Sequence, residues 1–190
     1  MTGRPAILSA TCTVALLAGT DTPADTAVPI SVEETKNCYR LSPDLYRSGQ
    51  PGDDGFKALE KLGLKSVLNL REYHSDDDEA KHTALHLYRF KLAAGKVSQE
   101  DLMNCLLIIH HAPKPILIHC WHGSDRTGIV CAAYRIVTQN WSPEKALAEL
   151  LDERFGHHRT YYSNLAELIR TTDWQSFKKE YRRKQQHPGS

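Results

Sequence analysis

The chain has 190 residues, a formal net charge of +1 and 25% charged residues. This length suits one domain with a single hydrophobic core. The near-neutral charge gives no sign of nucleic-acid binding, and beyond the N-terminal leader no apolar run is long enough to span a membrane. The five cysteines are widely spaced, a pattern that fits neither a disulfide scaffold nor a paired-cysteine zinc site.

The first 36 residues differ in composition from the rest of the chain. Arg4 precedes the apolar stretch 5–19, and a small, polar, proline-containing segment follows it. This order is typical of a secretory signal and a short linker. The sequence therefore predicts a signal peptide over residues 1–19, a linker over 20–36 and a periplasmic or secreted protein. A cytoplasmic protein with an N-terminal extension is the alternative.

The remaining chain alternates predicted strands and helices. In chain order, the pattern indicates short strands within 39–51, a helix over 54–62, strands over 65–71 and 85–90, a helix after the capping pair Ser98 and Asp101, a strand over 115–119, and helices over 126–139, 144–155 and 164–184. Such alternation predicts an α/β domain with a mostly parallel central sheet of about four to five strands flanked by helices. We place this single domain at residues 37–185 and a tail at 186–190.

The stretch ILIHCWHGSDRTG, residues 116–128, joins a buried strand, a polar loop and a helix start. Cys120 falls at the carboxyl end of the strand, where open α/β sheets place their ligand sites. Free N–H groups at the helix start form an anion site and stabilise a thiolate. Arg126 can offer two parallel N–H donors to a phosphate. This combination suits attack on phosphorus, with a cysteinyl phosphate that water then hydrolyses.

The predicted phosphate-binding loop lies between this central strand and the helix. Its six members are Trp121, His122, Gly123, Ser124, Asp125 and Arg126. Three neighbours are expected to support it. His119 orients the cysteine, Thr127 donates a hydrogen bond to the sulfur, and Gly128 allows close packing at the helix start. The catalytic residues expected are Cys120 as the nucleophile and Arg126 as the phosphate ligand.

The pattern His119-Cys120-x-x-Gly123-x-x-Arg126-Thr127-Gly128 resembles the signature of cysteine-dependent protein tyrosine phosphatases of the compact dual-specificity type. The resemblance covers about residues 39–168, through the segments LYRSGQP and LKSVLNLR and the helices after the loop. It implies a bacterial phosphatase that needs no metal or cofactor. Its implied partner is a phosphorylated protein or a small phosphate ester, bound by a monomer.

One part of that family's pattern is missing. Such enzymes place an aspartate roughly 25 to 30 residues before the cysteine, where it protonates the leaving oxygen. Residues 93–96 hold no acid. We expect Asp125 to be the general acid, with a purely bracing role as the alternative. A second source of the proton is the acidic cluster of Asp76, Asp77, Asp78 and Glu79, whose simpler interpretation is a solvated turn.

Other functions remain open at this point. Inositol phosphates or other small polyanions are the main alternative substrates, although the loop between Cys120 and Arg126 offers His122 and no lysine or arginine. A catalytically weak phosphate-binding module would keep the same anion site. Metal binding by His119, Cys120 and His122 lacks a second ligand pair at zinc-like spacing. Sulfur transfer fits the Arg-Thr-Gly ending of the loop less well than phosphate chemistry does.

Overall fold

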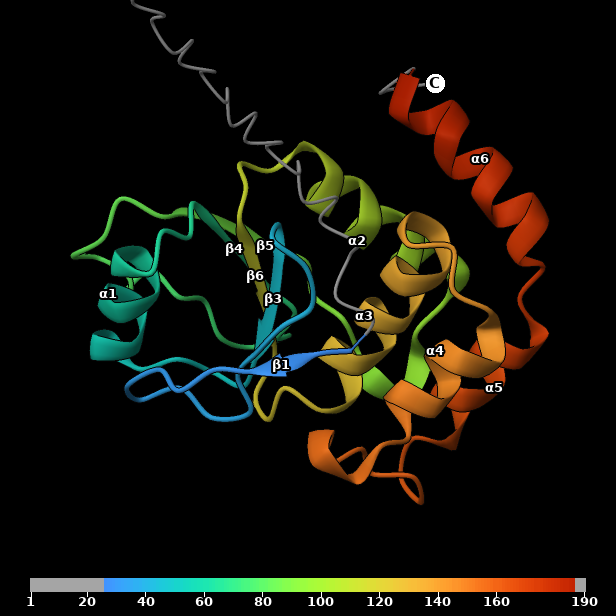
Figure 1. Ribbon diagram of the computed structural model, residues 1–190, viewed down its shortest axis with the longest axis horizontal. Helices are drawn as coiled ribbons and strands as arrows, with labels where there is room; N and C mark the ends of the chain where they lie inside the picture. Colours follow the sequence, from blue (N-terminus) through green and yellow to red (C-terminus); the bar gives the residue numbers. More distant parts are fainter. Residues whose placement is uncertain (1–25, 187–190) are drawn as a thin grey trace, which may run out of the picture.

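The structure, a computed structural model, describes residues 26–186 and contains one six-stranded sheet between two layers of helices (Figure 1). The strands lie side by side in the order β1 (Val28–Pro29), β2 (Tyr39–Arg40), β3 (Leu45–Ser48), β6 (Ile116–His119), β4 (Ser66–Asn69) and β5 (His86–Arg89). The first three pair antiparallel, and β3, β6, β4 and β5 pair parallel. The predicted α/β class and mostly parallel sheet are confirmed. The expected strand count was too low because two-residue strands such as β1 carry no periodic pattern.

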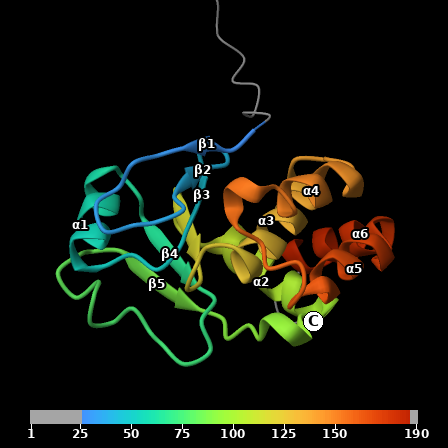
Figure 2. The same cartoon turned by 90° about the horizontal axis from the view of Figure 1, so that it is seen from below.

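A single helix covers one face of the sheet and a group of helices covers the other (Figures 1 and 2). The lone helix is α1 (Asp53–Lys61). The group on the opposite face consists of α2 (Gln99–His111), α3 (Asp125–Thr138), α4 (Pro143–Leu150), α5 (Ser163–Thr171) and α6 (Trp174–Gln186). Two short 3₁₀ turns, η1 (Ala94–Lys96) and η2 (Glu153–Phe155), complete the described elements.

The central strand β6 divides the hydrophobic core into two parts. Ile116 and Ile118 are buried among the residues of α2 to α6, whereas Leu117 between them belongs to the cluster around α1. Successive side chains of a strand point to opposite faces, so the apolar run of β6 fills both clusters. Burying each such side chain contributes roughly 1.5–3 kcal/mol. This packing fixes the orientation of β6 and with it the position of the residues that follow.

Two element boundaries in the structure differ from those expected from the sequence. The expected helix over 144–155 ends at Leu150, because the side chain of Asp152 accepts a hydrogen bond from the N–H of Arg154 and starts the separate turn η2. At the other end, β1 and the buried Ala27 lie within the stretch expected as a linker, so the packed chain begins before residue 37. The capping pair Ser98 and Asp101 forms at the start of α2 as predicted.

Some expectations fall outside the described residues. These are the signal peptide over residues 1–19, the linker residues 20–25, and residues 187–190 of the tail expected over 186–190, whose first residue instead ends α6. Within residues 26–186, every helix is too short or too polar to cross a membrane.

Candidate active site

The carboxyl ends of three parallel strands meet at one edge of the sheet. His119 of β6 is in register with Ser48 of β3 on one side and with Asn69 of β4 on the other. The segments that follow these residues therefore leave the sheet side by side, as they do at the ligand-binding edge of other parallel sheets. Cys120 begins the segment after β6, and Arg71 lies in the segment after β4.

The loop that carries Cys120 is held between β6 and the start of α3. Cys120 is 2% exposed, and the loop connects it to the helix, which begins at Asp125. Ser124 occupies the N-cap position, but its side chain makes no capping hydrogen bond. The first N–H groups of α3 are therefore available to an anion in the loop, which is the environment expected to hold phosphate oxygens and to favour a thiolate.

Gly123 allows the loop to pass close to the segment after β3. Its φ is +75°, and a Cβ atom placed there would lie 2.5 Å from the backbone nitrogen of Gly49 and 2.6 Å from the carbonyl oxygen of Ser48. Its own carbonyl oxygen accepts a hydrogen bond of 2.7 Å from Nη2 of Arg47. Arg47 is buried, with its guanidinium 4.1 Å from the ring centroid of Phe155. Arg47 therefore supports the loop, a role that the sequence analysis missed.

His119 is fixed by one carboxylate of the acidic cluster. Its Nε2 lies 2.8 Å from Oδ2 of Asp76, and its Nδ1 lies 3.2 Å from the carbonyl oxygen of Cys120. Gln50 donates a hydrogen bond of 2.9 Å to the other oxygen of Asp76. Burial raises the pKa of Asp76, but the hydrogen bonds from His119 and Gln50 outweigh it and lower the pKa below its usual range. The interpretation as a solvated turn is wrong for Asp76, which is 4% exposed, although the next two aspartates are exposed.

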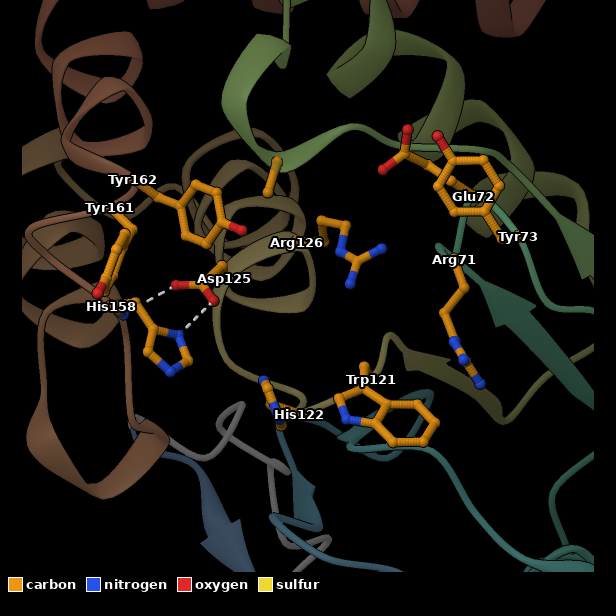
Figure 3. A pocket seen from close by; sticks show the side chains of 11 residues that line it. Arg71, Glu72, Tyr73, Trp121, His122, Asp125, Arg126, His158, Tyr161 and Tyr162 are labelled. Carbon is orange, nitrogen blue, oxygen red and sulfur yellow. Dashed lines mark hydrogen bonds and ion pairs between the residues drawn. The ribbon is translucent and has the colours of Figure 1, made fainter.

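Asp125 binds two histidines that follow η2. Its Oδ1 lies 2.7 Å from Nδ1 of His157 and accepts a hydrogen bond from the backbone N–H of His158, and its Oδ2 lies 2.7 Å from Nδ1 of His158 (Figure 3). Burial raises the pKa of Asp125, but these hydrogen bonds outweigh it and lower the pKa to about 2. A carboxylate that is ionised at neutral pH has no proton to give. The geometry therefore favours the bracing role of Asp125 over the expected role of general acid.

The first turn of α3 carries three further residues of the predicted site. Arg126 is half-buried, and its side chain points into the cavity in front of the loop (Figure 3). Thr127 is fully buried, and its Oγ1 has no hydrogen-bond partner among the described residues, so the expected bond to the sulfur is not made in this structure. Gly128 packs against α4, where a Cβ atom would lie 2.8 Å from Cδ1 of Leu150.

A cavity of about 430 Å³ opens in front of the loop (Figure 3). It is lined by Arg71, Glu72, Tyr73, Ala94, Trp121, His122, Asp125, Arg126, His158, Tyr161 and Tyr162. Arg71 is a second arginine of this cavity that the sequence analysis missed. Ala94 brings the segment 93–96 to the cavity wall, so the place where the resemblance implies an acid does face the site and carries no acidic side chain.

One group of side chains in the described chain could come together around a metal ion. His74, Asp76 and Glu79 have ligand atoms within 4.8 Å of one another. Both oxygens of Asp76 already accept hydrogen bonds, from Gln50 and His119, and His74 pairs with Glu79 at 2.8 Å. This group therefore serves the protein's own contacts. Within residues 26–186, the expected alternative of His119, Cys120 and His122 does not form a metal-binding group.

Comparisons with known proteins agree with this geometry. The family model described as "Tyrosine phosphatase family" matches residues 35–188. A relative from Pseudomonas aeruginosa, the dual specificity protein phosphatase TpbA, is 34% identical over 160 residues, which cover 79% of this chain and 72% of TpbA. The inositol diphosphatase SIW14 of Saccharomyces cerevisiae is 35% identical over 117 residues, covering 56% of this chain and 41% of SIW14.

Solved structures of the same two proteins share the fold. A crystal structure of P. aeruginosa TpbA in complex with phosphotyrosine matches with a TM-score of 0.76 and 27% identity, covering 86% of this chain and 99% of the TpbA chain. The catalytic domain of SIW14 matches with a TM-score of 0.67 and 29% identity, covering 83% and 98% of the two chains. The chain therefore belongs to the tyrosine phosphatase family, as a phosphatase of the protein-tyrosine-phosphatase type.

Proposed function

We propose that the protein hydrolyses phosphate monoesters on proteins, on tyrosine and on serine or threonine, through a cysteinyl-phosphate intermediate. The observation that carries the proposal is the position of Cys120, which is buried after the end of β6, in the loop that leads into the uncapped N-terminus of α3, with Arg126 at the cavity. The similarity to a dual specificity phosphatase supports the same substrate class. A catalytically weak binding module would not need the nucleophile.

The reaction runs in two steps. In the first, the Cys120 thiolate attacks phosphorus, a sulfur–phosphorus bond forms, the bond from phosphorus to the leaving oxygen breaks, and this oxygen takes up a proton from solvent water. The N–H groups of α3 and the guanidinium of Arg126 stabilise the charge that develops on the phosphoryl oxygens. In the second step, water attacks the cysteinyl phosphate, releasing inorganic phosphate and restoring the thiolate. The Thr127 hydroxyl, which has no other hydrogen-bond partner among the described residues, donates a hydrogen bond to the sulfur as it departs as a thiolate.

The experiment that tests this proposal measures turnover of phosphopeptides. The purified protein should release phosphate from phosphotyrosine, phosphoserine and phosphothreonine peptides, should be inhibited by vanadate and should be insensitive to chelators. Cys120→Ser should remove this activity and leave the fold nearly intact. Phosphate release that depends on an added metal, or that survives in the Cys120→Ser variant, would contradict the proposal.

A second candidate function is hydrolysis of a diphosphate group, as named for the relative SIW14. It is favoured by the lack of an acidic side chain on segment 93–96 and by the ionised state of Asp125. An alkoxide leaving group needs a proton, whereas a phosphate leaving group is a far weaker base and departs without one. Comparing kcat/KM for a phosphoserine peptide with kcat/KM for a diphosphoinositol phosphate separates the two functions.

Export to the bacterial envelope is proposed from Arg4 and the apolar stretch 5–19. Because Ala27 is buried and β1 begins at Val28, cleavage between Gly19 and Ala27 would leave the sheet complete. Mass spectrometry of the N-terminal peptide from fractionated cells tests this proposal. An intact Met1 on cytoplasmic protein would contradict it.

We also propose that the protein acts as a monomer and does not bind nucleic acid. The basic cluster near the C-terminus lies on α6, where Arg183 and Lys184 both pair with Glu180. Such paired charges on one helix favour a solvated surface over a nucleic-acid contact. Light scattering and a filter-binding assay at physiological salt would test both statements, which a stable dimer or a measurable nucleic-acid affinity would contradict.

A further inference from the structure

Arg71 lines the same cavity as Arg126 but comes from the segment after β4, whereas Arg126 belongs to α3. Arg126 points in from the start of α3, and Arg71 lies on the opposite wall beside Trp121 (Figure 3). The guanidinium of Arg71 stacks on the Trp121 ring at 4.3 Å from its centroid. Its Nη1 donates a hydrogen bond of 2.8 Å to Oε1 of Gln50. Arg71 is thus held in one orientation at the edge of the phosphate-binding loop.

Gln50 makes this arrangement rigid. Its backbone N–H donates to the carbonyl oxygen of Trp121 at 3.0 Å, and its side-chain amide donates to Asp76 at 2.9 Å. Asp76 in turn binds His119, the residue before the nucleophile. Arg71 is therefore built into the network that positions Cys120. An arginine that is ordered in this way loses little conformational entropy when it binds a ligand.

The positive charge of Arg71 is not neutralised by a direct ion pair. Among the described residues its guanidinium hydrogen-bonds to a neutral amide, and no carboxylate lies within ion-pair distance of it. Burial lowers its pKa, Asp76 raises it, and the positive charge of Arg126 lowers it again, so the net pKa is below the usual value. Two guanidinium groups that repel each other across one cavity form a site for more negative charge than one phosphoryl group carries.

The carboxylate of Asp125 in the same cavity keeps its negative charge, but among the described residues its ion-pair partners are His157 and His158 and neither of the two arginines. Both of its oxygens face His157 and His158, as described above. The sequence alone suggested a weakly basic loop, because it contains no lysine or arginine before Arg126. The fold adds Arg71 from the segment after β4 and engages Asp125 with two histidines, so that Arg71 and Arg126 face one remaining acid of the lining, Glu72. The cavity is thus more suited to a substrate with several negative charges than the loop sequence indicates.

We propose that Arg71 is a specificity-determining residue that binds a second phosphoryl group of the substrate, next to the phosphoryl group held by Arg126 and the loop. This inference rests on the proposed function, because it assumes that the first phosphoryl group lies over Cys120. The second group is attached either to the first, as in a diphosphate, or to a neighbouring residue of a doubly phosphorylated peptide. The enzyme should then prefer such substrates to those with a single phosphoryl group.

The test is a binding measurement that does not depend on turnover. The full chain carrying Cys120→Ser is titrated calorimetrically with inorganic phosphate and with inorganic pyrophosphate, alone and combined with Arg71→Gln. Hydrogen bonds to charged groups are worth enough to change affinity by about 10- to 100-fold. We expect Arg71→Gln to weaken pyrophosphate binding by about that factor and phosphate binding by clearly less. Arg182→Gln, on the exposed face of α6, removes the same charge outside the cavity and should change neither affinity.

Two peptide arms identify the source of the second phosphoryl group. A peptide with two adjacent phosphotyrosines and a peptide with one are compared in the same variants. Loss of selectivity for the doubly phosphorylated peptide in Arg71→Gln assigns the site to phosphoproteins, and an effect on pyrophosphate alone assigns it to diphosphates. Equal effects of Arg71→Gln and Arg182→Gln would overturn the inference, as would equal loss of phosphate and pyrophosphate affinity.

Failure of the proposed function would give other results than failure of this inference about Arg71. If wild-type protein binds pyrophosphate through Arg71 but hydrolyses no phosphate ester or anhydride, the function is wrong and the binding site stands. If the Cys120→Ser protein binds neither anion, both are wrong. Thermal unfolding of each variant is measured alongside, because a variant that retains the wild-type melting temperature reports on the cavity and not on the fold.

Discussion

Replacing Asp125 with Asn should destabilise the protein by an amount that depends on pH. The pKa of Asp125 is lowered from 3.8 to about 2, although burial alone would raise it, because His157 and His158 bind the ionised form. Such a depressed pKa corresponds to about 2.5 kcal/mol of stability. This contribution is fully present above the unfolded pKa of 3.8 and is lost as the pH falls through the folded value of about 2. About half of it should remain at pH 3.

The assay is urea unfolding of the wild-type protein and of Asp125→Asn at pH 7 and pH 3. The difference in unfolding free energy between the two proteins should be about 2.5 kcal/mol at pH 7 and about half of that at pH 3. Asp77→Asn is the matched control, because Asp77 is exposed and should change stability by less than about 0.5 kcal/mol. Equal stability of wild type and Asp125→Asn at pH 7 would refute the bracing role.

The same variant distinguishes bracing from acid catalysis. A bracing residue affects all substrates alike, so Asp125→Asn should lower kcat/KM for p-nitrophenyl phosphate and for a phosphoserine peptide by a similar factor. Loss of a general acid would instead harm the phosphoserine peptide, with its basic leaving group, by an additional factor of about 10²–10⁴. That selective loss would show that Asp125 is the proton donor after all.

Three further substitutions test other parts of the site. Arg126→Lys should lower kcat/KM at least about 100-fold with an unchanged circular dichroism spectrum, since a point charge cannot replace the two parallel donors; activity within tenfold of wild type would contradict this role. Asp76→Asn should cost about 1–3 kcal/mol in urea unfolding and also lower kcat, because the single amide oxygen cannot replace both carboxylate oxygens, which contact His119 and Gln50; an unchanged kcat would mean that His119 needs no orientation. Gly123→Ala should unfold at a clearly lower temperature than Gly95→Ala, because only Gly123 combines φ of +75° with a backbone atom 2.5 Å from the new Cβ; equal melting temperatures would contradict the packing argument.

The sequence predicts the part of the site that is contiguous in the chain. A strand, a polar loop and a helix start follow one another within residues 116–128, so local patterns suffice to place Cys120 and Arg126. Site residues that lie far from this stretch in the sequence cannot be predicted in the same way. Gln50 and Arg47 reach the loop because β3 pairs with β6, and no local pattern reveals which strands become neighbours.

Arg71 is the residue that the sequence could have indicated. It ends the predicted strand 65–71, and parallel strands place their carboxyl ends at the same edge as Cys120. His157 and His158 carry no such signal, because they lie in an irregular segment whose path depends on tertiary packing. Their contact with Asp125 decides the state of that carboxylate. The general acid expected from sequence was therefore the least predictable element of the site.

The measurement that tests the account most directly is the detection of phosphate on Cys120 during turnover. The protein is mixed with a p-nitrophenyl phosphate excess, quenched with acid within milliseconds and digested, and the peptide containing Cys120 is examined by mass spectrometry. We expect a peptide phosphorylated at Cys120, whose amount rises in a burst and falls to zero when the substrate is exhausted. Steady phosphate release without any phosphorylated Cys120, or with the phosphoryl group on another residue, would contradict the assignment of Cys120 as the nucleophile.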